Sequence, residues 1–253
     1  METTTVVKVV GGGVVLLHAA VLLSVPYVLM GRGAPYLPTF ARPMRLMFDQ
    51  LLPRHVNRLP SFQRAKALTV KAGNINSNSP ASLLQRATLV DLGSGDGRVV
   101  FEAARNGFGR CEGYEINPLL YFASQAWLAK HRIFGSLAPS SGDLEVPTIA
   151  SDANEEKVPP DTVTEPASDV KFHLKDFWNT DFGHADVVVV YGLTPIMERL
   201  SQKLWEELKP GALVVSNVFS LPTTVGWRQI DGEEGVYVYS KPLPNEETIE
   251  DEQ

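Results

Sequence analysis

The ten residues 89–98, LVDLGSGDGR, constrain the fold of this chain more than any other segment. A short apolar run ends there in three glycines at alternate positions, Gly93, Gly95 and Gly97. Glycine adopts backbone angles that other residues avoid, so this spacing favours a tight turn directly after a buried strand. Residues 98–106 follow with the apolar spacing of a helix, and Gly107 ends it. The segment therefore predicts a strand, a glycine turn and a helix in succession.

The rest of the chain repeats this alternation of apolar runs and helical patterns. The clearest predicted helix begins with Asn117 as its N-cap and Pro118 in its first turn, and another begins at Thr194. Strands are predicted at residues 87–92, 110–115, 170–175, 185–192, 212–218, 226–230 and 235–240. The last two are expected to pair antiparallel around a turn at Asp231-Gly232. This order predicts an α/β fold with a doubly wound sheet over residues 87–240.

Residues 9–30 form a long segment without a formal charge. As a helix this segment would reach ~33 Å, close to the ~30 Å hydrocarbon core of a bilayer. It predicts a transmembrane helix within a membrane anchor at residues 1–31. A cleaved signal peptide and a buried core helix are the alternatives, but the segment has no clean cleavage site and no polar stripe. Because arginines follow the segment, we expect the larger part of the chain on the cytoplasmic or matrix side.

Three further segments have an irregular composition. Residues 32–86 are expected to form one helix and then an irregular linker over residues 53–86, which contain NINSNSP. Residues 136–169 have five prolines, eight carboxylates and one lysine, which is typical of a disordered acidic insertion. Residues 241–253 form an acidic tail.

The formal charge of −6 excludes a global basic field, so a nucleic acid is not an expected partner. The arginines at 42, 45, 54 and 58 form a local basic cluster, for which contact with a membrane surface or simple topology is favoured over RNA. Cys111 is the only cysteine, so an intrachain disulfide and a cysteine-based zinc site are excluded. No metal is expected.

Carboxylates follow three predicted strands on the side where an open α/β sheet binds its ligand. Asp91 and Asp96 belong to the first strand and its turn, Glu115 ends the second strand, and Asp176 follows the third. The third glycine comes one residue too early for a dinucleotide fingerprint, and two carboxylates would repel a pyrophosphate. The same carboxylates would attract a cation, such as the ammonium group of an amino acid.

The order of these groups along the sheet describes one ligand. Asp91 is expected to attract an ammonium group, Glu115 to accept both hydroxyls of a ribose, and Asp176 to accept from an adenine amine beside the ring of Phe177. These parts together make up S-adenosylmethionine. The predicted cofactor-binding residues of the sheet are Asp91, Gly93, Ser94, Gly95, Glu115, Asp176 and Phe177.

The segments LVDLGSGDGR, GYEINP at 113–118 and LKDFWNT at 174–180 resemble the corresponding motifs of class I methyltransferases. The apolar segment, PYLPT at 35–39 and the helix ARPMRLMFDQLL at 41–52 narrow the resemblance to the membrane-anchored mitochondrial protein-lysine methyltransferases. The resemblance runs with interruptions from about residue 9 to residue 240. Segments 53–86 and 136–169 are longer than this family leads us to expect, and YGLTP at 191–195 is only loosely similar to its fourth-strand motif.

This resemblance implies a seven-stranded, Rossmann-like sheet and a lysine side chain of a membrane protein as substrate. Members of the family act on the ATP synthase c subunit or the adenine nucleotide translocase. It also implies a location at the mitochondrial inner membrane, with the catalytic domain facing the matrix. By the same resemblance, Tyr36 and Thr39 are expected to cover the methionine end of the cofactor.

Tyr191 is the predicted catalytic residue. A lysine ammonium has no lone pair and must lose a proton before it can attack a methyl group. An apolar channel lowers the pKa of lysine, so aromatic walls can take the place of a dedicated base. Tyr191 follows the fourth predicted strand, and we expect it to form such a wall with Phe177 and Trp178.

Two functions besides lysine methylation stay open from the sequence. A membrane-associated methyltransferase for a lipid or a small molecule would use the same cofactor site. A catalytically inactive, cofactor-binding regulator or assembly factor would bind the cofactor and transfer nothing. RNA methylation is disfavoured by the acidic segments.

Overall fold

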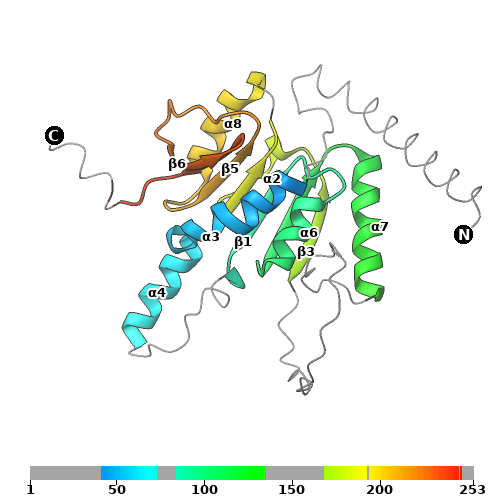
Figure 1. Ribbon diagram of the computed structural model, residues 1–253, viewed down its shortest axis with the longest axis horizontal. Coiled ribbons are helices and arrows are strands. Elements are labelled where there is room, and N and C mark those ends of the chain that lie inside the picture. Colours follow the sequence, from blue (N-terminus) through cyan, green and yellow to red (C-terminus); the bar gives the residue numbers. More distant parts are fainter. Residues whose placement is uncertain (1–40, 73–83, 135–167, 193, 245, 247–253) are drawn as a thin grey trace, which may run out of the picture.

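The computed structural model of this protein describes residues 41–72, 84–134, 168–192, 194–244 and 246. A seven-stranded sheet runs through them in the order β3-β2-β1-β4-β5-β7-β6 (Figure 1). The strands β1 to β5 are parallel, whereas β7 pairs antiparallel with both β5 and β6. The strands are β1 Thr88–Leu92, β2 Arg110–Glu115, β3 Asp169–Leu174, β4 Val187–Val190, β5 Leu213–Asn217, β6 Arg228–Glu233 and β7 Val236–Ser240. The predicted doubly wound α/β fold is confirmed, and the strand order reverses between β1 and β4.

The central strands β1, β4 and β5 are buried on both faces, and successive residues of a strand point to opposite faces. In β4, Val187 and Val189 belong to one hydrophobic cluster, whereas Val188 and Val190 belong to the other. The first cluster contains residues of α6, and the second contains residues of α8. This burial explains why the central strands read as continuous apolar runs in the sequence.

Among the described residues, three α-helices connect the strands, and their ends are set by local residues. They are α6 Arg98–Arg105, α7 Pro118–Phe134 and α8 Thr194–Glu207 (Figure 1). The Oδ1 atom of Asn117 accepts a hydrogen bond from the backbone N–H of Leu119 at 3.0 Å, which confirms Asn117 as the N-cap of α7. Gly107, with φ of +87°, follows α6, and its N–H donates to the carbonyl of Ala104 at 3.1 Å.

The helical segment before β1 is more regular than the sequence predicted. It consists of α2 Ala41–Arg45, the π-helix η1 Leu46–Leu51, α3 Leu52–His55, the 3-10 helix η2 Val56–Arg58 and α4 Pro60–Ala72. Pro53 has no N–H to donate to the preceding turn, which accounts for the widened π-helical turns before it. Met47 and Leu51 are completely buried in the cluster that includes α6.

The prediction of an irregular linker over residues 53–86 is therefore wrong for its first part. Residues 60–72 form α4, and Pro60 occupies its first position, where a missing N–H costs nothing. NINSNSP lies outside the described residues.

The hairpin at the end of the sheet also differs from the prediction. Asp231-Gly232 lies within β6, and the turn falls at Glu234 and Gly235, whose φ angles are 50° and 82°. A register shift between Gln229 and Asp231 accommodates the longer strand. At the other edge, Asp169 begins β3 rather than ending the acidic insertion.

Among the described residues, no helix combines the length and the apolar character needed to cross a membrane. The predicted span at residues 9–30, and with it the anchor at residues 1–31, lies outside them. The same holds for residues 135–167 of the predicted insertion and 247–253 of the tail.

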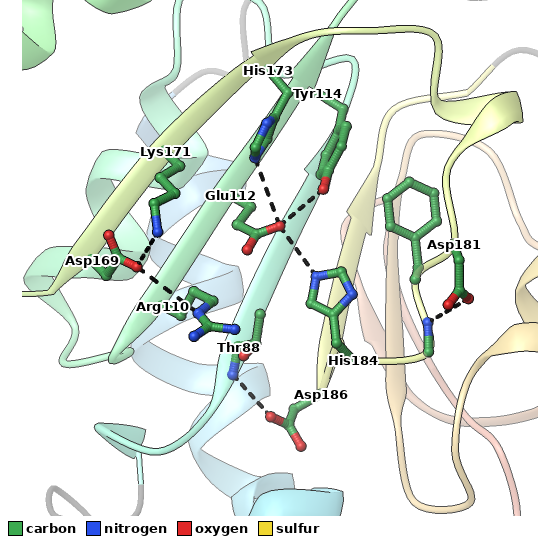
Figure 2. Close-up of polar contacts among 12 residues, drawn as sticks. Thr88, Arg110, Glu112, Tyr114, Asp169, Lys171, His173, Asp181, His184 and Asp186 are labelled. Carbon is green, nitrogen blue, oxygen red and sulfur yellow. Dashed lines mark hydrogen bonds and ion pairs between the residues drawn. The ribbon is translucent and has the colours of Figure 1, made fainter.

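A polar cluster occupies the face of β2 and β3 that points away from α6 (Figure 2). The Oε2 atom of Glu112 accepts a hydrogen bond from the Tyr114 hydroxyl at 3.0 Å and lies 3.1 Å from Nε2 of His184. The ring of His173 stacks on that of Tyr114, with the centroids 4.6 Å apart. The hydrogen bond from His184 is the main reason that the pKa of Glu112 falls to about 2, and the same bond raises the pKa of His184.

The thiol of Cys111 lies on the opposite face of β2 and is completely buried. Its Sγ atom is 3.5 Å from the carbonyl oxygen of Phe108. Burial raises the pKa of this thiol to about 12.

Candidate active site

The glycine turn after β1 is fastened to the neighbouring strand by its backbone. The N–H groups of Gly93 and Ser94 both donate to the carbonyl of Tyr114 in β2, at 2.8 and 3.1 Å. Gly93, Gly95 and Gly97 all have positive φ, at 80°, 54° and 90°. A Cβ atom added to Gly93 would meet nothing within 4 Å, so a ligand can approach the backbone at this position.

Glu115 organises the edge of the sheet where β1 and β2 end. Its Oε2 atom accepts from the N–H of Gly95 at 2.8 Å, and its Oε1 atom accepts from the N–H groups of Ile116 at 2.9 Å and Asn117 at 2.7 Å. The carboxylate is buried, which raises its pKa, although the three N–H groups oppose that shift. One side chain thus joins the glycine turn to the start of α7.

Asp91 is a buried carboxyl group beside two further carboxylates. Burial, followed by repulsion from Glu115 and Asp96, raises the pKa of Asp91 to about 8. Asp96 itself pairs with Arg98, whose Nε lies 2.8 Å from its Oδ2. A positive group placed next to Asp91 would reverse this shift, so the cluster fits the ammonium end of S-adenosylmethionine.

The Ser94 side chain is buried beneath the glycine turn. Its hydroxyl is buried and has no hydrogen-bond partner among the described residues. A Cβ atom at Gly113 would lie 2.7 Å from the Ser94 oxygen and 2.7 Å from Cδ1 of Phe172. The hydroxyl therefore packs beneath the turn against β2.

Asp176 begins a short 3-10 helix, η3 Phe177–Asn179, directly beyond β3. Its Oδ1 atom accepts from the N–H of Trp178 at 3.0 Å, which fixes the direction of the carboxylate. Phe177 is 8% exposed and belongs to the second hydrophobic cluster, so it offers a ligand little more than an edge. The Trp178 ring lies 4.1 Å below the guanidinium group of Arg199.

Tyr191 follows β4 at the same edge of the sheet and is half-buried. Its ring meets that of Phe219 edge-on, with the centroids 6.4 Å apart, and burial raises the pKa of its hydroxyl. Tyr191 is therefore a neutral hydrogen-bonding group at pH 7 rather than a base. The sequence predicted Phe177 and Trp178 as its aromatic neighbours, whereas the ring that contacts it is Phe219.

Sequence reasoning also missed Val218, which precedes Phe219 beyond the end of β5. Its φ of 73° lies in the left-handed region, which a β-branched residue rarely occupies. Its N–H donates to the carbonyl of Gly235 at 2.7 Å, and its side chain is 50% exposed. Strained residues of this kind collect at functional sites, but a valine carries no sequence signal for a left-handed backbone.

The structure thus gathers most of the predicted site at the carboxyl edge of the sheet. Asp91 and Glu115 lie near the ends of β1 and β2, and the glycine turn, Asp176 and Tyr191 lie beyond the ends of β1, β3 and β4. Tyr36 and Thr39 lie outside the described residues. Within the described part of the chain, no three His, Cys, Asp or Glu side chains are arranged so that they could hold a metal ion.

Comparison with known proteins points to one kind of enzyme. A family model, the ANTKMT methyltransferase domain, matches residues 160–228. The rat lysine N-methyltransferase of the ATP synthase c subunit is 31% identical over 165 residues, which cover 64% of this chain and 61% of the relative. The mouse adenine nucleotide translocase lysine N-methyltransferase is 29% identical over 157 residues, covering 60% and 52%.

A protein-lysine N-methyltransferase of Saccharolobus islandicus (strain REY15A) is 34% identical over 148 residues. That alignment covers 58% of this chain and 70% of the relative. By contrast, the chain spans only 42% of the mouse enzyme and 45% of the human enzyme that methylate the ATP synthase c subunit.

Proposed function

We propose that this chain, which belongs to the family of protein-lysine N-methyltransferases, transfers a methyl group from S-adenosylmethionine to the side chain of a lysine. The observation that carries the proposal is the arrangement of Asp91, Glu115 and the open backbone at Gly93 on one edge of the sheet. This edge offers negative charge and an open approach to the backbone at Gly93 to a cationic nucleoside ligand.

The residues at this edge would hold the cofactor in a defined order. Asp91 faces the ammonium group, Glu115 lies at the ribose, and Asp176 lies at the adenine. When bound, the sulfonium group supplies an electrophilic methyl carbon. Because Glu115 already fixes the glycine turn, the protein spends little conformational entropy in ordering this part of the site.

Tyr191 is proposed to act on the lysine rather than on the cofactor. Its phenol stays neutral because burial raises its pKa, so it can accept or donate a hydrogen bond without adding charge. Together with Phe219 it forms an aromatic wall that disfavours the ammonium form of an entering lysine. The lysine would lose its proton to solvent at the edge of this aromatic wall, and the neutral amine would then attack the methyl carbon.

The substrate is proposed to be a protein of the mitochondrial inner membrane, such as the ATP synthase c subunit or the adenine nucleotide translocase. The matching relatives carry those two substrates in their names. The uncharged segment 9–30 supports the same assignment, because a membrane anchor raises the effective concentration of an enzyme near a membrane-embedded lysine. In this arrangement the catalytic domain faces the matrix.

Mass spectrometry of membrane proteins from cells with and without this chain tests the substrate. The expected result is one lysine whose methylation disappears with the chain and returns with the wild-type gene, but not with the Asp91→Asn variant. Labelled cofactor supplied to membranes, liposomes and metabolite extracts gives a second test. Label found only in lipid or in a small molecule contradicts the proposal, and so does cofactor binding without any transfer.

The anchor is tested separately by deleting residues 1–30. The shortened protein should bind S-adenosylhomocysteine as the full chain does, yet methylate the membrane-embedded substrate more slowly. An unchanged rate in native membranes would remove the anchor from the mechanism while leaving the methyltransferase assignment intact.

A further inference from the structure

A second concave site lies at the edge of the sheet opposite the cofactor site, where the parallel strands begin. Its cavity has a volume of about 380 Å³. Thr88 begins β1, Arg110 begins β2 and Asp169 begins β3, and His184 comes shortly before β4 (Figure 2). The cavity is lined by Arg64, Gln85, Arg86, Thr88, Gly109, Arg110, Asp169, His184 and Lys209. No step of the proposed methyl transfer uses these residues.

The lining is strongly basic, although the chain as a whole carries a formal charge of −6. Four cationic side chains, Arg64, Arg86, Arg110 and Lys209, face one carboxylate, Asp169. That carboxylate is already neutralised, because its Oδ2 lies 2.6 Å from Nζ of Lys171 and 4.0 Å from Nε of Arg110.

Two of the four cations lack a counter-charge within the described part of the chain. Arg86 and Lys209 are exposed, and neither makes an ion pair with another described residue. Gathering like charges around a cavity raises the free energy of the empty site, and a bound anion removes that cost. The imbalance therefore favours an anionic ligand.

The cavity has a rigid floor. The N–H of Gly109 donates to the carbonyl of Leu84 at 3.0 Å, and its carbonyl accepts from the N–H of Asp169 at 2.8 Å. A Cβ atom at Gly109 would lie 1.7 Å from the carbonyl oxygen of Gln85, so only glycine permits this contact. These bonds fix the backbone next to Arg86 and Arg110.

Asp186 ties the helix that carries Arg64 to the sheet. Its buried carboxylate accepts from the N–H of Ser61 at 2.8 Å. It also accepts from the N–H of Thr88 at 2.9 Å (Figure 2). The first turn of α4 is thereby fastened to the start of β1, and Arg64 follows Ser61 by three residues on the same helix. Arg110 thus begins a strand, Arg86 and Lys209 lie shortly before β1 and β5, and the helix of the remaining cation is tied to β1, so the backbone that carries the cations is preorganised.

We propose that this basic cavity binds a compact anion that bears phosphate groups. Guanidinium groups match the oxygens of a phosphate in pairs, and a lysine adds a point charge. Phosphate oxygens could come from a free oligophosphate or from the headgroup of an anionic phospholipid, and both present the same chemistry. An extended nucleic acid is less suited, because the cations line one cavity and not a stripe along the surface.

Calorimetric titration of the full-length protein with tripolyphosphate, and flotation with neutral and anionic phospholipid vesicles, test the proposal. Arg86→Glu and Lys209→Glu should each weaken binding by at least roughly tenfold. Lys66→Glu is the matched control, because Lys66 is exposed on the same helix as Arg64 but does not line the cavity. Arg86→Gln repeats the test without a charge reversal, and unchanged binding of S-adenosylhomocysteine reports that each variant is folded.

The outcomes separate the two sources of phosphate. If tripolyphosphate binds, and if Arg86→Glu and Lys209→Glu weaken this binding but Lys66→Glu does not, the result supports a free oligophosphate as the ligand. If tripolyphosphate does not bind, but the protein prefers anionic to neutral vesicles and the same two variants abolish this preference, the result supports a lipid headgroup as the ligand. The proposal is overturned if neither probe binds, if Lys66→Glu weakens binding as much as the lining variants do, or if only a single-stranded RNA oligonucleotide binds.

Discussion

The carboxylate of Glu115 accepts a hydrogen bond from the backbone N–H of Gly95 at 2.8 Å, across 20 residues of sequence. The end of β2 therefore holds the turn that follows β1. The same carboxylate accepts from the first residues beyond its own strand. A residue assigned to the ribose thus also shapes the turn that receives the amino-acid end of the cofactor.

Glu115→Gln is expected to weaken S-adenosylhomocysteine binding by roughly 10–100-fold. The amide has one acceptor oxygen where three N–H donors now face two, so at least one buried donor loses its partner, at a cost of about 1–3 kcal/mol. Titration calorimetry measures the effect. Glu206→Gln, at an exposed position of α8, should leave the affinity unchanged. Equal affinities for Glu115→Gln and wild type would remove Glu115 from the site.

Asp91 predicts a pH dependence of cofactor binding. With a pKa of about 8, Asp91 is largely protonated at neutral pH in the cofactor-free protein, and a bound ammonium group would ionise it. Affinity for S-adenosylhomocysteine should therefore rise from roughly pH 6 to pH 8, with proton release on binding. Calorimetry in buffers of different ionisation enthalpy measures this release.

The stability of the cofactor-free protein should respond to Asp91 in the opposite sense. The folded pKa lies above the ordinary aspartate value of 3.8, so the stability that Asp91 contributes is complete below pH 3.8 and is lost as the pH rises to about 8. Asp91→Asn should consequently raise the melting temperature at pH 8 while it abolishes cofactor binding. A melting temperature that falls in this variant would contradict the assigned cost of the buried charge.

Tyr191→Phe should lower kcat for lysine methylation by roughly 10–100-fold, which corresponds to one lost hydrogen bond to a charged or reacting group. The dissociation constant for S-adenosylhomocysteine should not change, because Tyr191 is assigned to the lysine. Tyr121→Phe, at a half-buried position of α7, is the matched control. An unaltered rate in Tyr191→Phe would show that the hydroxyl takes no part.

The Glu112–His184 pair should stabilise the folded protein most within a limited pH range. The folded pKa of Glu112 is about 2, below the ordinary glutamate value of 4.5, so its contribution is present above pH 4.5 and is lost toward pH 2. His184 has a raised pKa, so its contribution is complete below pH 6.5 and is lost as the pH rises through the folded value. Both contributions are present between roughly pH 4.5 and 6.5.

Within that window Glu112→Gln should reduce the free energy of unfolding by about 1–2 kcal/mol, since the His184 side chain is 36% exposed and solvent screens the pair. Urea denaturation over a pH series measures the difference. The wild-type and variant curves should converge toward pH 2, and a constant gap over the whole range would contradict the ion pair.

The elements that were predicted most accurately are those with a local signal in the sequence. Residues 110–115 form β2 with the predicted bounds, and α7 begins at Pro118 behind the Asn117 cap. The carboxylates of Asp91 and Glu115 follow from the same logic, because parallel strands bring their carboxyl ends to one edge. Hydrophobic periodicity and helix capping depend on residues close together in the sequence, so both can be recognised without knowledge of the fold.

The features that the sequence did not predict depend on distant contacts. Asp231-Gly232 is a strong hairpin signal, but pairing with Val238 and Tyr237 of β7 keeps both residues in β6 and moves the turn to Glu234 and Gly235. The basic cavity arises because the starts of several strands meet in space. The start of α4 did have a local signal, Pro60 at its first position.

The burial of Cys111 makes the natural chain a ready background for site-specific labelling. Maleimides and spin-label reagents attack thiolates, and a completely buried thiol with a pKa of about 12 presents almost none at neutral pH. A cysteine introduced at Phe122, which is 63% exposed on α7, would therefore be the one group that such reagents modify. Fluorescent or paramagnetic probes can thus be attached to this protein without first replacing its natural cysteine.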